Sequence, residues 1–171
     1  MENKVYFAKL KNDVILPSKN YDNAGYDIYA NFTEEYIVIK PNETKMIPTK
    51  LVSAFSNKYV AILKERGSTG TKGIGQRCGV IDSSFRGEWF IPITNHNNVD
   101  LYIIKSNVTV LNINKSDSTN FNRSIKYPYE KAICQCIFVE LPETIIEETD
   151  IENIMNIVST RGKGMLGSTK K

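Results

Sequence analysis

Asp82 lies in a segment whose residue types could activate a water molecule. It follows small and apolar residues in the run GVID at residues 79–82, which predicts that its carboxylate leaves the end of a strand and enters a turn. From there a carboxylate could orient a water molecule and accept its proton. Phe85 offers a flat apolar surface that could pack against a sugar ring. The alternative is that Asp82 only begins an Asx turn.

The run RGSTGTKG at residues 66–73 could bind phosphate. Its three glycines allow backbone amides to approach an anion closely, and Arg66 carries a planar fork of donors that suits phosphate. Ser68 and Thr69 add hydroxyl groups. The run lacks the spacing GxxxxGK[ST], so it is not a P-loop. A glycine-rich turn with a surface arginine is the alternative.

Three further segments carry polar residues in unusual settings. In AGYDIYA at residues 24–30, Gly25 permits a close backbone approach and Asp27 could face an arginine or a metal-bound water. In ICQCI at residues 133–137, Gln135 could donate to a phosphate oxygen. In RGKGMLGST at residues 161–169, Arg161 could clamp a phosphate from a mobile lid. A solvent-facing strand position, or a disordered basic tail, is the alternative for each.

Several kinds of chemistry are excluded by composition. The only histidine, His96, lies in a polar, turn-like run typical of a surface residue, so nucleophilic catalysis by a Ser-His or Cys-His pair has little support. Of the three cysteines, Cys134 and Cys136 lack the CxxC spacing of a zinc site, and we interpret them as small buried hydrophobes. A net charge of +3 is too small to indicate nucleic-acid binding.

The elements that must position these residues are mainly strands. Apolar, aromatic and β-branched runs predict strands at residues 4–10, 36–40, 44–47, 59–63, 88–93, 101–111 and 132–140. Turn clusters separate these runs, which favours an all-β sandwich, jelly roll or barrel. Helical periodicity is confined to residues 150–158, where Asp150 could cap one face of apolar residues. We therefore expect at most one short helix.

Length and patterning indicate one domain. The 171 residues contain 41% hydrophobic and 24% charged residues, as in an ordinary globular protein. No apolar run reaches the roughly 18 residues that span a bilayer, and no signal-peptide core is evident, so we expect a cytoplasmic protein without membrane association. Residues 112–127 have the composition of a long exposed loop or hairpin tip, and residues 160–171 that of a flexible tail.

Taken in order, these five segments resemble the five motifs of the trimeric dUTPase family, the deoxyuridine triphosphate nucleotidohydrolases. The motifs are AGYDIYA, RGSTGTKG, GVIDSSFRG, ICQ and RGKGMLGST, and they extend from residue 24 to residue 169. The resemblance implies a distorted β jelly-roll subunit, assembled as a homotrimer with active sites at subunit interfaces. It implies hydrolysis of dUTP to dUMP and pyrophosphate with Mg²⁺ on the triphosphate. That reaction lowers dUTP and supplies dUMP for dTTP synthesis.

The resemblance also implies a role for each matching residue. Asp82 would activate the water that attacks the α-phosphorus, and Asp27 would orient Arg66 and the water shell of the metal. Residues 75–79, named the base segment below, would read uracil as a hairpin, largely through backbone groups. The implied substrate-binding residues are Arg66, Gly67, Ser68, Gln76, Gly79, Val80, Ile81, Phe85, Gln135, Arg161, Leu166, Gly167, Ser168 and Thr169. The implied organisation is a domain over residues 1–159 and a lid over residues 160–171.

The chain departs from the family pattern at several positions. Gly67 and Ser68 replace the usual Ser-Gly or Ser-Ser, Phe85 replaces a tyrosine, and Leu166 stands where phenylalanine is common. The sequence Glu-Lys-Ala at residues 130–132 replaces Gly-Asp-Arg. An insert at roughly residues 97–130 exceeds the usual connection and resembles inserts of some phage-encoded relatives.

Two other functions stay open. One is an interaction protein of the phage dUTPase type, which would bind a repressor or host factor through its insert. The other is a dCTP deaminase, which shares the fold but requires a different catalytic carboxylate and an arginine-rich nucleotide loop. Release of ammonia from dCTP, rather than pyrophosphate from dUTP, would distinguish the deaminase.

Overall fold

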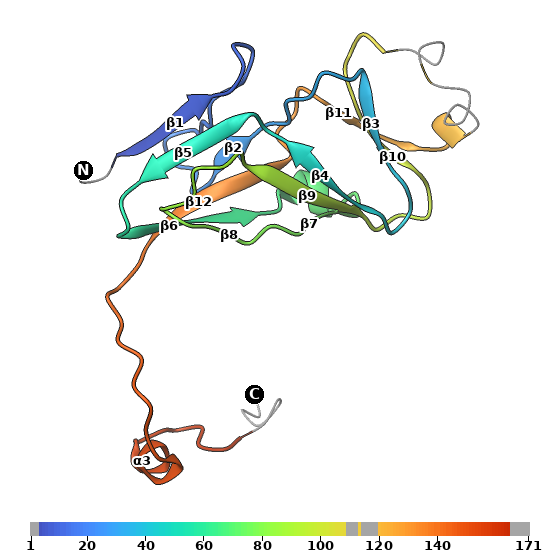
Figure 1. Cartoon of the computed structure of the whole chain (residues 1–171). Coiled ribbons are helices and arrows are strands. Elements are labelled where there is room, and N and C mark those ends of the chain that lie inside the picture. The colour runs from blue at the N-terminus through green and yellow to red at the C-terminus, as the bar shows by residue number, and fades with distance from the viewer. Residues whose placement is uncertain (1–3, 109–112, 114–119, 165–171) are drawn as a thin grey trace. The chain divides into compact units, whose positions relative to one another are not determined.

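The computed structural model describes residues 4–108, 113 and 120–164, and these residues form twelve strands and two short helices (Figure 1). The mostly β architecture confirms the expected fold class. The strands are β1 (Val5–Lys9), β2 (Tyr26–Ile28), β3 (Tyr36–Ile39), β4 (Thr44–Pro48), β5 (Leu51–Phe55), β6 (Tyr59–Lys64), β7 (Ile74–Gln76), β8 (Val80–Ile81), β9 (Phe90–Asn95), β10 (Leu101–Ile104), β11 (Ile125–Pro128) and β12 (Cys134–Glu140); the helices are α1 (Gly67–Gly70) and α3 (Ile151–Asn156).

The strands pair in four small sheets, of which one positions most of the candidate site residues. This sheet has the order β2-β12-β6-β8, with β12 antiparallel to both of its neighbours, as Figure 1 shows. Its register places Gln135 opposite Asp27 on β2 and opposite Lys64 on β6. The other sheets have the orders β1-β5, β4-β9-β7 and β11-β10-β3.

Alternation along the strands produces the core between these sheets. In β5 the side chains of Leu51, Ser53 and Phe55 are buried, whereas the intervening two are only partly buried, as expected for a strand with one face on a core. Trp89 is fully buried at the centre, where its indole Nε1 donates a hydrogen bond of 3.1 Å to Ser53 Oγ. That bond satisfies the polar end of the ring inside the apolar core.

The insert packs on a second, smaller apolar cluster beside the sheet β11-β10-β3. Val38, Tyr102, Ile113 and Phe121 are its buried members, and the rings of Tyr102 and Phe121 meet edge to face at 5.0 Å between centroids. Residues 112–127 are therefore not simply an exposed loop, because they include buried side chains and the strand β11. The strand predicted over residues 101–111 ends at Ile104; residues 109–112 and 114–119 lie outside the described residues.

The expectation of at most one short helix is wrong, because α1 forms in addition to α3. Glycine at both ends of α1 gives no helical signal, since glycine is a poor helix former. The helix is held by Thr69, whose Oγ1 accepts from Arg66 N at 3.2 Å and donates to Arg66 O at 2.8 Å.

Helix α3 lies within the predicted range, directly after Asp150, although the Asp150 side chain makes no capping hydrogen bond. No helix in the described ranges is long and apolar enough to cross a membrane.

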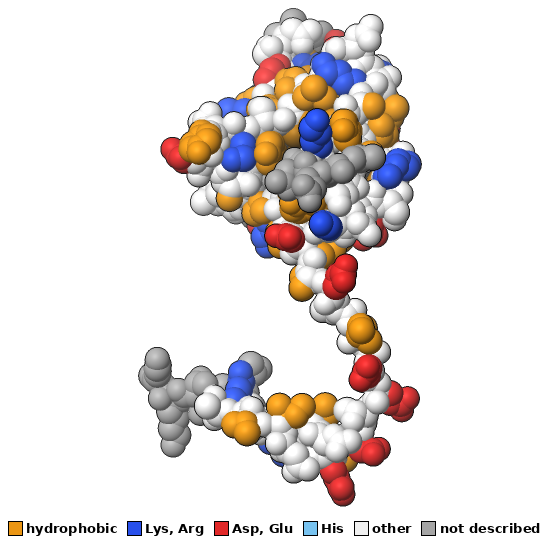
Figure 2. All heavy atoms as spheres, turned by 90° about the vertical axis from the view of Figure 1, so that its left-hand side faces the viewer, with side chains coloured by type: hydrophobic (Ala, Val, Ile, Leu, Met, Phe, Trp, Pro, Cys, Tyr) orange, Lys and Arg blue, Asp and Glu red, His pale blue; other side chains and the backbone are white. Residues whose placement is uncertain are grey.

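The chain divides into two compact units, Met1–Leu141 and Pro142–Lys171. The second unit contains α3, and Figure 2 shows apolar side chains gathered on its surface. Ile151 and Val158 are 70% and 97% exposed there. The predicted organisation into a domain over residues 1–159 and a lid over residues 160–171 stays a prediction, because the two units are not placed relative to each other.

Candidate active site

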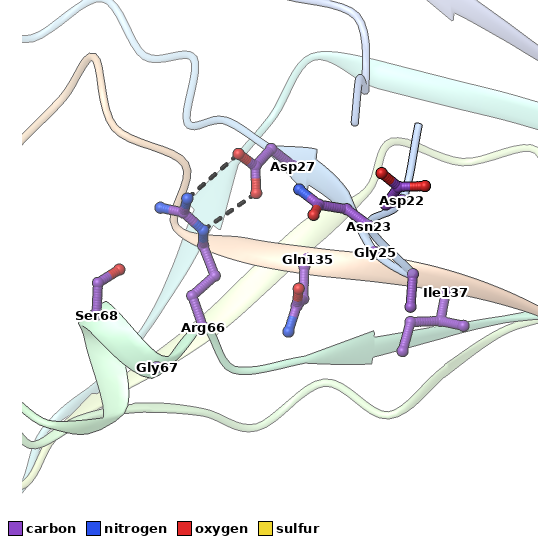
Figure 3. A pocket seen from close by; sticks show the side chains of 10 residues that line it. Asp22, Asn23, Gly25, Asp27, Arg66, Gly67, Ser68, Gln135 and Ile137 are labelled. Carbon is purple, nitrogen blue, oxygen red and sulfur yellow. Dashed lines mark hydrogen bonds and ion pairs between the residues drawn. The ribbon is translucent and has the colours of Figure 1, made fainter. Parts of the chain in front are cut away.

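An open cavity of about 580 Å³ lies where β2, β12 and α1 meet (Figure 3), and its size is typical of a small-molecule site. We name it the Arg66 cavity. It is lined by Asp22, Asn23, Ala24, Gly25, Asp27, Arg66, Gly67, Ser68, Gln135 and Ile137. The structure thus brings together five of the predicted site residues, from three segments far apart in the chain: Asp27, Arg66, Gly67, Ser68 and Gln135.

The guanidinium group of Arg66 is held by Asp27 through two contacts, drawn as dashed lines in Figure 3. Arg66 Nε lies 3.1 Å from Asp27 Oδ1, and Arg66 Nη2 donates to Asp27 Oδ2 at 3.2 Å. Both side chains are about one-third exposed, so the pair borders the solvent of the cavity rather than the core. A bidentate pair fixes the plane of the guanidinium, which orients its donors before a ligand binds.

Gln135 is positioned by its neighbours on both sides. Its Nε2 donates a 3.0 Å hydrogen bond to the backbone oxygen of Glu65. On the other side, a Cβ atom added to Gly25 would lie only 2.6 Å from Gln135 Oε1 and 3.0 Å from its Cβ. Gly25 therefore provides the close backbone approach that its residue type suggested, and a side chain there would displace Gln135.

Gly67 and Ser68, the first two residues of α1, line the cavity beside Arg66. The first N–H groups of a helix have no partner inside it, so these amides suit an anion beside the Arg66 guanidinium. The charge of Arg66 and these donors together would bind an oxyanion such as phosphate.

Sequence reasoning missed the support behind Arg66. Arg66 Nη1 donates to Ala132 O at 3.2 Å, and the buried hydroxyl of Tyr127 donates to the same oxygen at 2.6 Å. Burial raises the pKa of Tyr127, so the phenol stays protonated and keeps this donor. Tyr127 belongs to β11, at the end of the segment that composition suggested was a loop, and its neighbouring Asn- and Ser-rich sequence hid it.

The base segment is not a hairpin, because β7 and β8 belong to different sheets and do not pair with each other. Gln76 in β7 lies opposite Ile93 of β9, whereas Val80 in β8 lies opposite Ile62 of β6. Gln76 Nε2 donates to Cys78 O within the connection. The segment therefore crosses from one sheet to another, where Gly79 is exposed and a Cβ atom there would meet no other atom within 4 Å.

Asp82 and Phe85 do not line the Arg66 cavity of their own chain. Ile81 lies opposite Ala61 of β6, and Gln135 lies opposite Lys64 of the same strand. With a rise of about 3.3 Å per residue and about 4.8 Å between strands, the Cα atoms of Ile81 and Gln135 are about 14 Å apart. Asp82 is exposed, and Phe85 is 43% exposed, so both face outward from this subunit.

The predicted lid residues belong to the second unit. Arg161 Nε donates to Gly164 O at 3.1 Å within that unit. Leu166, Gly167, Ser168 and Thr169 lie outside the described residues. Their proposed contacts with substrate therefore stay predictions.

The described side chains contain no group of three or more His, Cys, Asp or Glu that could hold a metal ion.

Cys134 and Cys136 are fully buried in the main core, as small hydrophobes would be. Desolvation by burial raises the pKa of Cys136 to about 12, and the pKa of Cys134 is raised for the same reason. Both thiols are therefore protonated at neutral pH and are poor nucleophiles.

Comparison with known proteins identifies the family that the chain resembles. The family model of the dUTPases matches residues 11–108, more than half of the chain. A deoxyuridine 5'-triphosphate nucleotidohydrolase of Leptospira interrogans is 32% identical over 96 residues, which cover 54% of this chain and 66% of that enzyme. The alignment thus spans just under two thirds of the curated relative.

Solved structures of phage dUTPases share the fold. The G164S mutant of the Staphylococcus bacteriophage 80alpha dUTPase with dUpNHpp has a TM-score of 0.73 and 21% identity, over 98% of both chains. The D95N mutant of the S. aureus phage phi11 dUTPase, described for its structural Mg(II) ion, has a TM-score of 0.65 and 19% identity, over 86% of this chain and 97% of that one. The likeness confirms the expected jelly-roll fold. The match of the family model over more than half of the chain shows that this chain belongs to the dUTPase family.

Proposed function

We propose that the chain is a dUTP diphosphatase, which hydrolyses dUTP to dUMP and pyrophosphate. The observation that carries the proposal is the Arg66 cavity, in which an oriented guanidinium, the amides of α1 and Gln135 converge. Family membership supplies the substrate class, and the cavity supplies donors suited to a triphosphate. Removing dUTP and supplying dUMP for dTTP synthesis follow from that reaction.

The proposed active unit is a homotrimer. Asp82, the residue that we propose activates water, does not line the Arg66 cavity of its own chain. In a cyclic trimer, each chain could present its exposed Asp82 and Phe85 to the cavity of its neighbour, so that three equal sites form. This arrangement explains why these two residues face outward.

In the proposed mechanism, the Asp82 carboxylate accepts a proton from water as the water oxygen attacks the α-phosphorus of dUTP. A new phosphorus–oxygen bond forms, the bond to the bridging oxygen of pyrophosphate breaks, and the two products leave. Arg66, Gly67, Ser68 and Gln135 bind phosphate oxygens and stabilise the charge that develops on them.

Other predicted residues would select and enclose the substrate. The ring of Phe85 would stack on deoxyribose and disfavour a 2′-hydroxyl group. The base segment, with Gln76 and Gly79, and the adjacent residues Val80 and Ile81 would contact uracil and its sugar. Arg161, Leu166, Gly167, Ser168 and Thr169 would close over the terminal phosphates and the base as a lid.

The cavity fits a magnesium ion that binds together with the triphosphate. Asp22 and Asp27 place carboxylate oxygens, the ligand type that Mg²⁺ prefers, on its lining. Because both carboxylate oxygens of Asp27 contact Arg66, we propose that Asp27 contacts the ion through water. The ion would neutralise charge on the phosphate oxygens.

The proposed activity is tested by measuring pyrophosphate and ammonia after mixing the full chain and Mg²⁺ with dUTP or dCTP. We expect pyrophosphate and dUMP from dUTP. Ammonia from dCTP would identify a deaminase, and no product from either nucleotide would also contradict the proposal.

A second function, binding of a regulatory protein through the insert, is favoured by the packing of that region. Phe121 is buried against Tyr102, so the exposed Asn122 and Arg123 beside it are presented from a supported surface. Arg123→Glu should weaken capture of a protein partner and leave dUTP hydrolysis unchanged. Loss of hydrolysis in this variant would contradict an interaction role for this surface that is separate from catalysis.

A further inference from the structure

Glu65 contacts both regions that the proposed reaction uses, although neither the motifs nor the cavity lining includes it. It lies between Lys64, the last residue of β6, and Arg66. Its backbone oxygen accepts the 3.0 Å hydrogen bond from Gln135 Nε2, and its carboxylate Oε1 accepts the backbone N–H of Gln76 at 3.0 Å. A single residue therefore joins the phosphate side of the chain to the base segment.

The hydrogen bond from Gln76 N–H to the Glu65 carboxylate satisfies a backbone donor on the edge strand β7. In the order β4-β9-β7, strand β7 pairs with β9 on one side only, so its other side has backbone groups that no strand covers. The Glu65 carboxylate takes the place of a neighbouring strand at Gln76, which is the last residue of β7 before the chain crosses to β8. Gln76 lies within the base segment, and the connection from it to β8 is short, so this hydrogen bond constrains the position of the segment.

The Glu65 carboxylate lies beside two glycines, Gly70 and Gly75. A Cβ atom added to Gly70 would lie 3.5 Å from Glu65 Oε2, and one added to Gly75 would lie 3.7 Å from Oε1. These are ordinary contact distances, so the carboxylate lies between the end of α1 and β7. A charged acceptor in this position makes a stronger hydrogen bond than a neutral one.

We propose that Glu65 is a positioning residue that determines base selection, by anchoring the base segment through the N–H of Gln76. The proposal rests on the proposed dUTP diphosphatase activity. Glu65 does not touch the reacting atoms. Its carboxylate sets the position of the backbone groups that read the base, and its backbone oxygen holds Gln135 whatever its side chain.

This division of roles predicts a specific kinetic pattern. Glu65→Ala removes the acceptor for Gln76 but keeps the backbone oxygen that holds Gln135. We expect KM for dUTP to rise and the ratio of kcat/KM for dUTP over dCTP to fall about tenfold, as for the loss of one charge-assisted hydrogen bond. We expect kcat for dUTP to change less than about twofold, because the phosphate side stays in place.

The experiment compares the full chain with three variants, using pyrophosphate release from dUTP and from dCTP. Glu65→Gln keeps an oxygen acceptor and should restore most of the ratio. Glu43→Ala is the matched control, since Glu43 Oε2 accepts the backbone N–H of Lys40 at 2.7 Å in a turn that does not line the cavity. It should leave the ratio unchanged.

The outcomes separate this proposal from the one on which it rests. If the unmodified chain releases no pyrophosphate from dUTP, the proposed function fails and the role of Glu65 fails with it. If that chain hydrolyses dUTP and Glu65→Ala keeps the same dUTP over dCTP ratio, only the role of Glu65 is overturned. A ratio that falls equally in Glu43→Ala would show a general effect on folding and would also overturn it.

Discussion

In the Arg66 cavity the side chains hold one another, whereas around Asp82 the side chains face solvent. Arg66 contacts both carboxylate oxygens of Asp27 and the carbonyl of Ala132, and Gln135 is held by the backbone of Glu65. For the Asp82 carboxylate, the described part of the chain contains no hydrogen-bond or ion-pair partner. One chain therefore orients Arg66 and Gln135, which we propose bind phosphate, and leaves the proposed water-activating carboxylate of Asp82 exposed.

The two regions have different requirements. Donors that stabilise a developing charge are most effective when they are fixed before the substrate binds. A general base needs access to a water molecule and a position near the phosphorus, and a neighbouring chain can supply that position. The contrast predicts that changes at Asp82 affect turnover, whereas changes in the cavity affect the binding of phosphate as well.

The largest effect is expected for Asp82→Asn. Loss of the general base should lower kcat for dUTP about 10³-fold, because an amide cannot accept the proton of the attacking water. Binding of the analogue dUpNHpp, measured by calorimetry, should stay close to that of the unmodified chain. Near-normal turnover would contradict the assignment of Asp82.

A smaller loss is expected for Arg66→Lys. Lysine cannot contact both oxygens of Asp27 in one plane, so kcat/KM for dUTP should fall about 100-fold. Arg123→Lys is the matched control, since Arg123 is an exposed residue of the insert and does not line the cavity. Equal activity of the two variants would mean that the pair with Asp27 contributes nothing to catalysis.

Gly25→Ala tests the contact between β2 and Gln135. The new Cβ atom would overlap Gln135 Oε1 at 2.6 Å, so we expect the amide to move and KM for dUTP to rise about tenfold. Gly70→Ala is the control, because its Cβ atom would meet the Glu65 carboxylate at an ordinary 3.5 Å. An unchanged KM in Gly25→Ala would show that Gln135 does not contribute to binding.

The smallest functional effect is expected at the cysteines. Because burial raises the pKa of Cys136 from 9.0 to about 12, a thiol reagent at pH 8 should modify the half-buried Cys78 first and Cys136 only after unfolding. The raised pKa also means that the native state binds the proton more tightly than the unfolded chain. Its contribution to stability is complete below about pH 9 and is lost as the pH rises towards 12. Rapid labelling of Cys136 in the native protein would contradict its burial.

The sequence predicted strands best in short runs that contain β-branched residues and are bounded by turn residues. The runs at residues 36–40 and 44–47 correspond closely to β3 and β4. The strand β5 was missed because its sequence, LVSAF, contains small residues in the middle and offers a weak alternation. The strand β11 was missed because its pairing with β10 is parallel and therefore depends on a distant segment.

In the candidate site too, local sequence patterns identified residue types but not the contacts that form only on folding. Motif order identified the residues that meet in the Arg66 cavity, since each motif carries a recognisable residue type. It could not identify Tyr127 or Glu65, because their roles depend on which backbone group lies beside them after folding. Nor could it show that Asp82 lies apart from the cavity, since linear order contains no information on strand register.

The most direct test of the central claim, that Arg66 and Asp82 of different chains share one site, uses two inactive variants. Asp82→Asn and Arg66→Ala are unfolded separately, mixed in equal amounts, refolded and assayed for pyrophosphate release from dUTP. In a cyclic trimer assembled at random, about one quarter of the sites would combine an intact Arg66 with an intact Asp82. We expect recovery of about a quarter of the unmodified activity, and activity no higher than that of the separate variants would contradict a site shared between chains.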